Sequence, residues 1–279
     1  QKHCTRAKLL AMAIKLEHHN PRCILDIGCN RGALLEEFRY CYPRAELHGM
    51  DLNPIFKSAL EDTSMVFHSS LDEICETFDM VVCSHTMMYV PSLGYLQNRM
   101  GSLASPEGIL VLIVPNFAAT HPQLLLGDQH HYFSEASLLE FCGPLGEPKI
   151  LRLEALPHEL VCVVRRGNAT YPNSKDPAEK TLGLALKELT RVSDIIRGID
   201  EQVAVLGTST VAAFVDEVLP AGAAMFVDES DLKSFRGRPV EHPKMLQKNM
   251  PILLAYGARN KGIRERFRKR YQIERFLLM

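Results

Sequence analysis

Short apolar runs alternate with amphipathic segments along the first 166 residues of the chain. The apolar runs have the length of strands, and the segments between them carry apolar residues at helical spacing. This alternation predicts a mainly parallel sheet with helices on both faces. Strands are expected at residues 23–27, 46–50, 65–68, 78–83, 109–114, 149–154 and 159–164, and helices at residues 5–18, 34–41, 55–60, 94–103 and 134–141.

The last two of these strands are joined by a short loop that contains Pro157 and His158. A parallel connection needs a crossover of about a dozen residues or more, so these two strands have to pair antiparallel. The sequence therefore predicts a parallel sheet that includes one antiparallel strand.

A second α/β pattern follows a polar segment that is rich in turn-forming residues. After a long helix at residues 178–197, a buried strand leads into Gly207, and the next strand ends at Asp228. A smaller Rossmann-like domain is therefore expected in the second part of the chain. The predicted domains and the linker between them lie at residues 1–166, 178–279 and 167–177.

A glycine-rich turn directly follows the first strand. Asp26 lies near the end of that strand, and Gly28, Asn30 and Gly32 follow at alternate positions before the next helix. Asp51 ends the second strand roughly 20 residues later. This layout is typical of a nucleoside-binding βαβ unit, in which glycines let the backbone approach the ligand and a carboxylate binds ribose hydroxyls. Because an acid inside the turn repels phosphate, the turn favours a cationic ligand over a pyrophosphate.

Four segments of the chain resemble, in order, the motifs of class I S-adenosylmethionine (SAM)-dependent methyltransferases. They are residues 25–32, 49–54, 78–85 and 108–116. The resemblance covers residues 5–166 approximately. It implies a class I methyltransferase Rossmann-like fold, methyl-transfer activity and S-adenosyl-L-methionine as the cofactor.

The resemblance also implies which residues bind the methyl donor. Asp26 would receive the amino group of its methionine part, and Asp51 would bind its ribose hydroxyls. Leu52 would pack on the adenine, and Ser69 and Ser70 would lie near the adenine edge. Turn capping is the alternative role for both aspartates, and a helix N-cap is the alternative for the two serines. The expected cofactor-binding residues are Asp26, Gly28, Asn30, Gly32, Asp51, Leu52, Ser69, Ser70 and Ser84.

The acceptor is expected to bind near residues 127–134, because loops at the carboxyl ends of parallel strands hold the substrates of such sheets. This segment is similar to the Glu-His-x-x-Tyr-Phe-Ser segment of sugar C-methyltransferases, whose histidine is the proposed base. Gln129 stands at the place of that histidine, so the base would be His130 or His131. A structural role is the alternative for both. The expected catalytic residues are His130, His131, Tyr89 and His85.

The second domain has a weaker resemblance of its own. Its strand-glycine turn, Phe226-Val227-Asp228 and Gly237-Arg238-Pro239-Val240 resemble the C-terminal domain of sugar C-methyltransferases that act on nucleotide-linked keto-sugars. The resemblance implies a small-molecule acceptor, a sugar or nucleotide sugar, methylated at carbon or oxygen. Two alternatives stay open. One is methylation of another small metabolite, with the second domain serving for homodimer formation, and the other is a SAM-binding scaffold without turnover.

Composition and charge argue against several other classes. The formal net charge of −1 gives no reason to expect nucleic acid as a partner, and the longest apolar runs are too short to span a membrane. The eight cysteines form no C-x-x-C pair, so we expect free buried thiols in the reducing cytoplasm and no metal site. The His-His pair beside Asp128 has no third ligand at suitable spacing. The basic run at 259–270 is expected to be a solvated helix face, with Ile263 and Phe267 turned inward.

Overall fold

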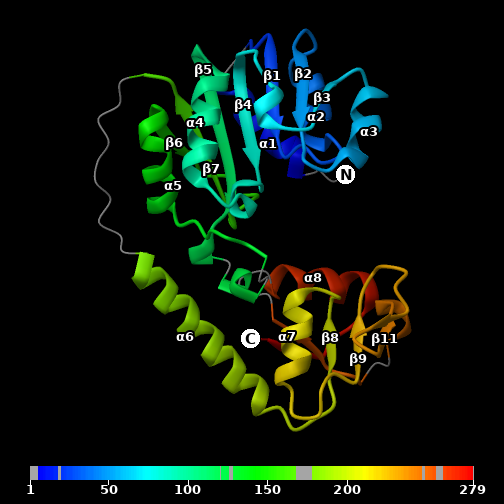
Figure 1. Cartoon of the computed structure of the whole chain (residues 1–279). Helices are drawn as coiled ribbons and strands as arrows, with labels where there is room; N and C mark the ends of the chain where they lie inside the picture. Colours follow the sequence, from blue (N-terminus) through cyan, green and yellow to red (C-terminus); the bar gives the residue numbers. More distant parts are fainter. Residues whose placement is uncertain are drawn as a thin grey trace. The chain divides into compact units, whose positions relative to one another are not determined.

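The computed structural model of the 279-residue chain describes residues 6–17, 20–119, 121–125, 128–167, 178–246, 249–255 and 260–278. The chain divides into two compact units, Gln1–Thr120 with Asp128–Thr181 and His121–Gly127 with Leu182–Met279. In Figure 1 most of the first unit is coloured from blue to green, and the second unit from yellow-green to red. All of the predicted linker except residue 167 lies outside the described residues, so the linker stays a prediction.

The described residues of the first unit form a seven-stranded sheet in the order β3-β2-β1-β4-β5-β7-β6 (Figure 1). The strands from β1 to β5 run parallel, whereas β7 runs antiparallel to both β5 and β6. The predicted sheet with one antiparallel strand is therefore confirmed. The strands are β1 (Cys23–Ile27), β2 (Glu46–Met50), β3 (Val66–His68), β4 (Phe78–Ser84), β5 (Ala104–Pro115), β6 (Glu147–Leu151) and β7 (Glu159–Arg165).

Each face of this sheet carries its own hydrophobic cluster. Successive residues of a strand point to opposite faces, so Ile24 and Leu25 of β1 belong to different clusters. Helix α2 adds Leu35 to one cluster, and α5 adds Leu138 to the other. Burying one such side chain stabilises the fold by roughly 1.5–3 kcal/mol. The helices are α1 (Arg6–Lys15), α2 (Ala33–Cys41), α3 (Lys57–Glu61), α4 (Leu93–Leu103) and α5 (Glu135–Cys142), with 3-10 turns η1 (Pro54–Phe56), η2 (Leu71–Glu73), η3 (Met87–Tyr89), η4 (Phe117–Ala119) and η6 (Gly143–Leu145).

Strand β5 begins at Ala104 rather than at the predicted residue 109. The register between β4 and β5 shifts near Phe78, and a Cβ at Gly108 would lie 2.9 Å from the Phe78 carbonyl oxygen. A bulge of this kind accommodates turn-forming residues within a strand. The segment after β5 contains η4 and a further 3-10 turn, η5 (His121–Leu125).

The second unit is a smaller α/β structure, as predicted. Its described residues form a six-stranded sheet in the order β10-β11-β9-β8-β12-β13, in which β10 and β11 pair antiparallel and all other neighbours pair parallel. The elements are α6 (Ala178–Arg197), β8 (Ala204–Leu206), α7 (Thr210–Val218), β9 (Met225–Val227), β10 (Ser234–Phe235), β11 (Arg238–Glu241), η7 (Pro243–Met245), β12 (Ile252–Leu254), α8 (Asn260–Tyr271) and β13 (Phe276–Leu278).

The basic helix α8 packs as the sequence predicts. Phe267 is buried in a hydrophobic cluster, and Ile263 packs against the same cluster. Arg266 and Arg270 on this helix both pair with Glu229. One carboxylate, Glu229, therefore pairs with two of the basic residues of this helix.

The cysteines of the described residues are free thiols, as expected. Four of them are buried, namely Cys29, Cys83, Cys142 and Cys162. Cys75 is exposed, because it follows the η2 turn at the surface, and this differs from the expectation of buried thiols. None of the described helices is long and apolar enough to cross a membrane.

Candidate active site

A cavity of about 370 Å³ lies where the parallel strands of the first unit end. Four loops contribute to it, namely those that follow β1, β2, β3 and β4. Such loops at the carboxyl ends of strands are the usual ligand sites of open α/β sheets. The lining residues are Ile27, Gly28, Asn30, Met50, Asp51, Leu52, Ser70, Leu71, His85, Thr86, Tyr89, Val90, Tyr95 and Leu96.

The loop after β1 depends on glycine at Gly28. This residue has a φ of +75°, and a Cβ there would lie 1.9 Å from Oγ1 of Thr86. Any larger residue would therefore push the loop away from the one that follows β4. The backbone N–H groups of Gly28 and Cys29 donate to the Met50 carbonyl at 2.7 and 3.0 Å, which ties the loop to the end of β2. Gly32, with a φ of +78°, then starts α2.

Asp51 is held rigidly at the cavity wall. Its Oδ2 accepts the backbone N–H of Asn30 at 3.0 Å, and its Oδ1 accepts that of Asn53 at 2.9 Å. A carboxylate has about four lone-pair sites, so two sites remain for ligand hydroxyls. Next to it, Leu52 lines the cavity with 78% of its surface exposed.

The charges around the cavity suit a cationic nucleoside. Among the described lining residues Asp51 is acidic, and none is Lys or Arg. A pyrophosphate would meet a carboxylate here without a compensating cation. A ribose bearing a positively charged substituent would find a hydroxyl acceptor and a favourable electrostatic potential. The described residues therefore fit SAM better than a dinucleotide.

Asp26 lies behind the cavity rather than in its wall. Its side chain is 3% exposed, and Oδ1 has no hydrogen-bond partner among the described residues. Burial, together with the negative charge of Asp51, raises the pKa of Asp26 to about 7, against a smaller opposing effect of Arg6. The carboxyl group is therefore half ionised near neutral pH, and positive charge in the cavity would favour its ionised form.

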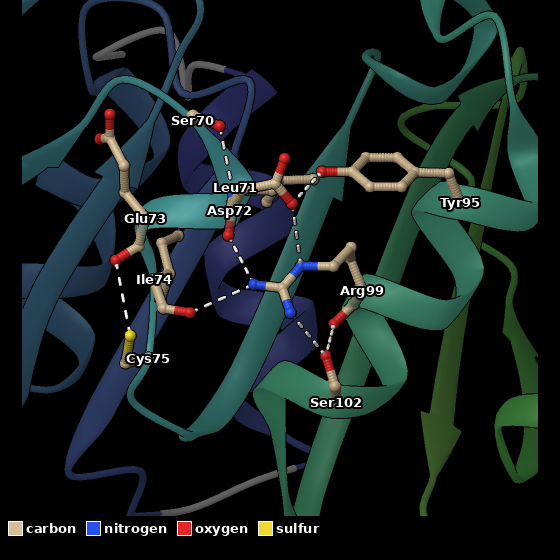
Figure 2. A network of polar contacts seen from close by, with 9 residues as sticks. All are labelled: Ser70, Leu71, Asp72, Glu73, Ile74, Cys75, Tyr95, Arg99 and Ser102. Atoms are coloured by element: carbon tan, nitrogen blue, oxygen red, sulfur yellow. Dashed lines mark hydrogen bonds and ion pairs between the residues drawn. The ribbon is translucent and has the colours of Figure 1, made fainter.

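A polar network holds the wall formed by Ser70 and Leu71 (Figure 2). Arg99 of α4 donates to the carbonyl oxygens of Leu71 at 2.5 Å and Ile74 at 3.1 Å. The hydroxyl of Tyr95, which itself lines the cavity, donates to Asp72 at 2.7 Å. Helix α4 thereby fixes the η2 turn that carries Ser70 as its N-cap.

His85 lines the cavity and has an unusual backbone conformation. Its φ of +53° is rare for a residue with a side chain. Its Nε2 lies 3.4 Å from Oε2 of Glu159, whose carboxylate also receives two bonds from Arg6 at 2.5 and 2.8 Å. Although burial opposes it, the neighbouring His85 and Arg6 lower the pKa of Glu159 to about 2. Glu159 is therefore ionised at neutral pH and lies beside the imidazole, whose Nε2 has no hydrogen-bond partner among the described residues.

The loop that precedes α5 lies against η3. Both His130 and His131 donate their backbone N–H to the Met88 carbonyl, at 2.8 and 3.3 Å. A ring nitrogen of His131, Nε2, is 3.0 Å from the Val90 carbonyl. Because a carbonyl only accepts, that nitrogen carries the proton and Nδ1 is left as the basic atom. The side chain of His130 is exposed, and neither histidine lines the cavity.

About half of the predicted site residues line the cavity. It is lined by Gly28, Asn30, Asp51, Leu52, Ser70, His85 and Tyr89. The predicted residues that do not line it are Asp26, Gly32, Ser69, Ser84, His130 and His131. Ser69 binds Glu73 instead, with its hydroxyl 2.9 Å from both carboxylate oxygens, and Ser84 accepts a 3.3 Å bond from Arg6.

Several residues of the site escaped prediction. The apolar wall residues Val90 and Leu96 resemble ordinary core positions in the sequence. Arg6 and Glu159 are separated by 153 positions, so no local motif joins them. The one available signal was that Glu159 begins the last strand of the expected antiparallel pair.

The fold and the cavity define a Rossmann-like domain with a nucleoside site at its strand ends. A methyltransferase-domain family matches residues 3–160, which is more than half of the chain. The chain therefore belongs to this family of methyltransferases. At this level the prediction of a methyltransferase domain is confirmed. No curated protein matches the sequence.

Solved structures of low sequence identity are similar to the chain over 58% of its length. A candidate O-methyltransferase from Nostoc punctiforme is 16% identical with a TM-score of 0.49, and the match covers 56% of that protein. The plantazolicin methyltransferase BpumL, in complex with a desmethylPZN analog and SAH, is 14% identical with a TM-score of 0.48 and 83% coverage. A TehB-like SAM-dependent methyltransferase from Corynebacterium glutamicum is 18% identical with a TM-score of 0.45 and 88% coverage. The chain thus spans about half the length of the Nostoc protein.

Proposed function

We propose that the protein transfers a methyl group from SAM to a small-molecule acceptor, with a sugar or nucleotide-linked sugar as the acceptor class. The observation that carries the proposal is the Asp51 carboxylate, fixed by two backbone N–H groups at the wall of a cavity without Lys or Arg among its described lining residues. The methylated atom is a carbon or an oxygen.

Each part of the cavity has a defined task in this proposal. Bound SAM supplies a methyl group on a sulfonium centre, which is open to in-line displacement. Asp51 accepts hydrogen bonds from ribose hydroxyls, and Leu52 covers the adenine. The Gly28 loop brings backbone close to the ligand, and Asp26 holds negative charge behind it. These residues bind and align the donor. The proton of the acceptor is removed by another group.

His85 is the base that we assign to the acceptor. It lines the cavity, and a carboxylate oxygen of the ionised Glu159 lies 3.4 Å from its Nε2. A carboxylate-oriented imidazole is a common general base, because histidine titrates near neutral pH. His131 and His130 are the alternative bases, since their loop is joined to η3 of the cavity wall. Tyr89, whose hydroxyl is 3.4 Å from the Gln129 amide, is a further candidate for acceptor contact.

The sugar acceptor is supported by the sequence resemblances and by the layout of the second unit. There, Gly207 with a φ of +84° follows β8, and Ser209 caps α7. Asp228 at the end of β9 accepts the Thr208 hydroxyl at 3.1 Å and the Ser230 N–H at 2.8 Å. This arrangement repeats the Asp51 layout and would suit hydroxyl-rich ligands. A homodimer, a cytoplasmic location and the absence of nucleic-acid partners stay predictions.

The test is methyl transfer from SAM labelled at the methyl group. Purified protein is incubated with nucleotide-linked sugars, free sugars, small phenols and short peptides, with the Asp51→Asn variant as the control. We expect label in at least one sugar or nucleotide sugar, and little with the variant. If the label is transferred only to another class of acceptor, that class replaces the sugar as the proposed substrate. SAM binding with no transfer to any class would favour a binding protein without turnover.

A further inference from the structure

A cluster of side chains that could bind a metal lies at the amino ends of β1 and β2, whereas the cavity lies at the carboxyl ends of the strands. Cys23 and Glu46 are the first residues of β1 and β2 and stand side by side in the parallel register. His48 lies two residues farther along β2, on the same face. The Sγ of Cys23, a carboxylate oxygen of Glu46 and a ring nitrogen of His48 all lie within 4.8 Å of one another.

The decisive feature is the buried imidazole of His48. This residue is 4% exposed, and its Nε2 has no hydrogen-bond partner among the described residues. Oε1 of Glu46 is 3.2 Å away, but the geometry does not make a hydrogen bond. An unsatisfied buried nitrogen of this kind is costly unless something binds it.

The other nitrogen of His48 has the partner that a metal-bound histidine requires. Nδ1 is 2.9 Å from Nε2 of His68, and the two rings stack with their centroids 5.2 Å apart. Metal-bound histidines almost always donate their second N–H to a neighbouring acceptor, which fixes the ring. If Nδ1 donates to His68, Nε2 is left as a free ligand atom. The edge of Phe78, 5.0 Å away, packs the ring in place.

The surrounding charges also favour a cation. The carboxylates of Glu46, Asp79 and Glu76 act electrostatically on the Cys23 thiol, and a divalent cation bound there would be attracted by them.

We propose that Cys23, Glu46 and His48 form a zinc site at the amino ends of β1 and β2. Mixed sulfur, nitrogen and oxygen ligands suit Zn²⁺, with bonds of about 2.0–2.3 Å. Tetrahedral bonds of that length place ligand atoms about 3.3–3.8 Å apart, so the cluster needs to close by about 1.5 Å at most. The Glu46 side chain is 65% exposed and free to rotate inward. Three protein ligands leave the fourth position to solvent.

The spacing of these residues along the sequence does not reveal the site, because its ligands come from two different strands. Cys23 and Glu46 are separated by a whole helix, and neither belongs to a C-x-x-C or H-x-x-H pattern. The parallel register brings them together. The site lies at the opposite strand ends from the Asp51 cavity, so its existence does not depend on the proposed function.

The test uses untagged full-length protein that has been stripped of metal with EDTA. Titration with ZnCl₂ against a chromophoric chelator should give one bound ion per chain. Titration with CoCl₂ should give a thiolate-to-cobalt absorption band in the near ultraviolet. Cys23→Ser should abolish the band and weaken Zn²⁺ binding at least about tenfold, and Glu46→Gln, at an exposed position, should weaken it about tenfold.

The matched control is Cys41→Ser, which removes a half-buried thiol at the end of α2. This variant should keep both the cobalt band and the affinity for zinc. Far-UV circular dichroism confirms that each variant is folded. Binding of less than one ion per chain by the parent protein, or equal affinity in the parent, Cys23→Ser and Glu46→Gln, would overturn the proposal.

Discussion

Replacing His85 by glutamine should lower kcat for methyl transfer by about 10²–10⁴, the range that a general base contributes. The dissociation constant for SAM should change little, because Asp51 and the Gly28 loop bind the donor on other walls of the cavity. Glutamine keeps most of the imidazole volume but cannot take a proton near neutral pH. The measurement is single-turnover transfer of a labelled methyl group, with SAM affinity determined separately by calorimetry.

The matched controls are His130→Gln and His131→Gln. Both change a histidine of the neighbouring loop, and neither side chain lines the cavity. We expect kcat within a few-fold of the parent protein for His130→Gln. A moderate loss is expected for His131→Gln, whose ring is bonded to the Val90 carbonyl. A large loss of kcat in either loop variant, with normal kcat in His85→Gln, would show that a histidine of the loop is the base and that His85 is not.

Asp26→Asn should stabilise the protein at pH 8 by up to about 4 kcal/mol. The carboxyl holds its proton more tightly in the folded chain, where its pKa is about 7, than in the unfolded chain, where it is near the ordinary 3.8. Its contribution to stability is complete below about pH 4 and is lost as the pH rises to about 7. Asparagine cannot ionise, so its advantage should be small at pH 4 to 5 and reach a plateau above pH 7. Urea unfolding at pH 5 and pH 8 measures this difference.

The same variant should weaken SAM binding despite its greater stability. Ionised Asp26 attracts a cationic ligand, so the affinity of the parent protein for SAM should rise up to about tenfold between pH 6 and pH 8. This dependence should vanish in Asp26→Asn, and it should be absent for adenosine, which carries no positive charge. Equal pH dependence in the parent and the variant would show that Asp26 does not interact with the donor. A less stable variant at pH 8 would contradict the raised pKa.

The sequence was sufficient for most of the first unit because its signals are local. Strand β1, the Gly28 turn and Asp51 follow one another closely, and each has a strong conformational reason for its residue type. Gly28 has a positive φ and no room for a Cβ, and Asp51 caps the turn in which it stands. The short connection between β6 and β7 likewise fixed their antiparallel pairing.

The part of the cavity around His85 was less predictable because it depends on contacts between distant residues. Arg6 and Glu159 are 153 positions apart, and the carboxylate of Glu159 lies 3.4 Å from Nε2 of His85. The loop histidines matched a family segment, yet the fold directs His131 to a backbone carbonyl instead of the cavity. Ser69 and Ser84 were similarly diverted by Glu73 and Arg6. Side-chain direction at these positions is decided by tertiary partners that a local pattern does not contain.

The most direct test of the donor site is calorimetric titration of SAM into the parent protein, Asp51→Asn and Asp228→Asn. Asp228 is a matched control, since it also ends a strand and accepts a backbone N–H two residues on, at 2.8 Å. We predict micromolar binding by the parent and by Asp228→Asn, and a loss of about 10- to 100-fold in Asp51→Asn, as for hydrogen bonds to a charged group. No binding by the parent protein, or equal affinity in Asp51→Asn, would contradict a SAM site in this cavity.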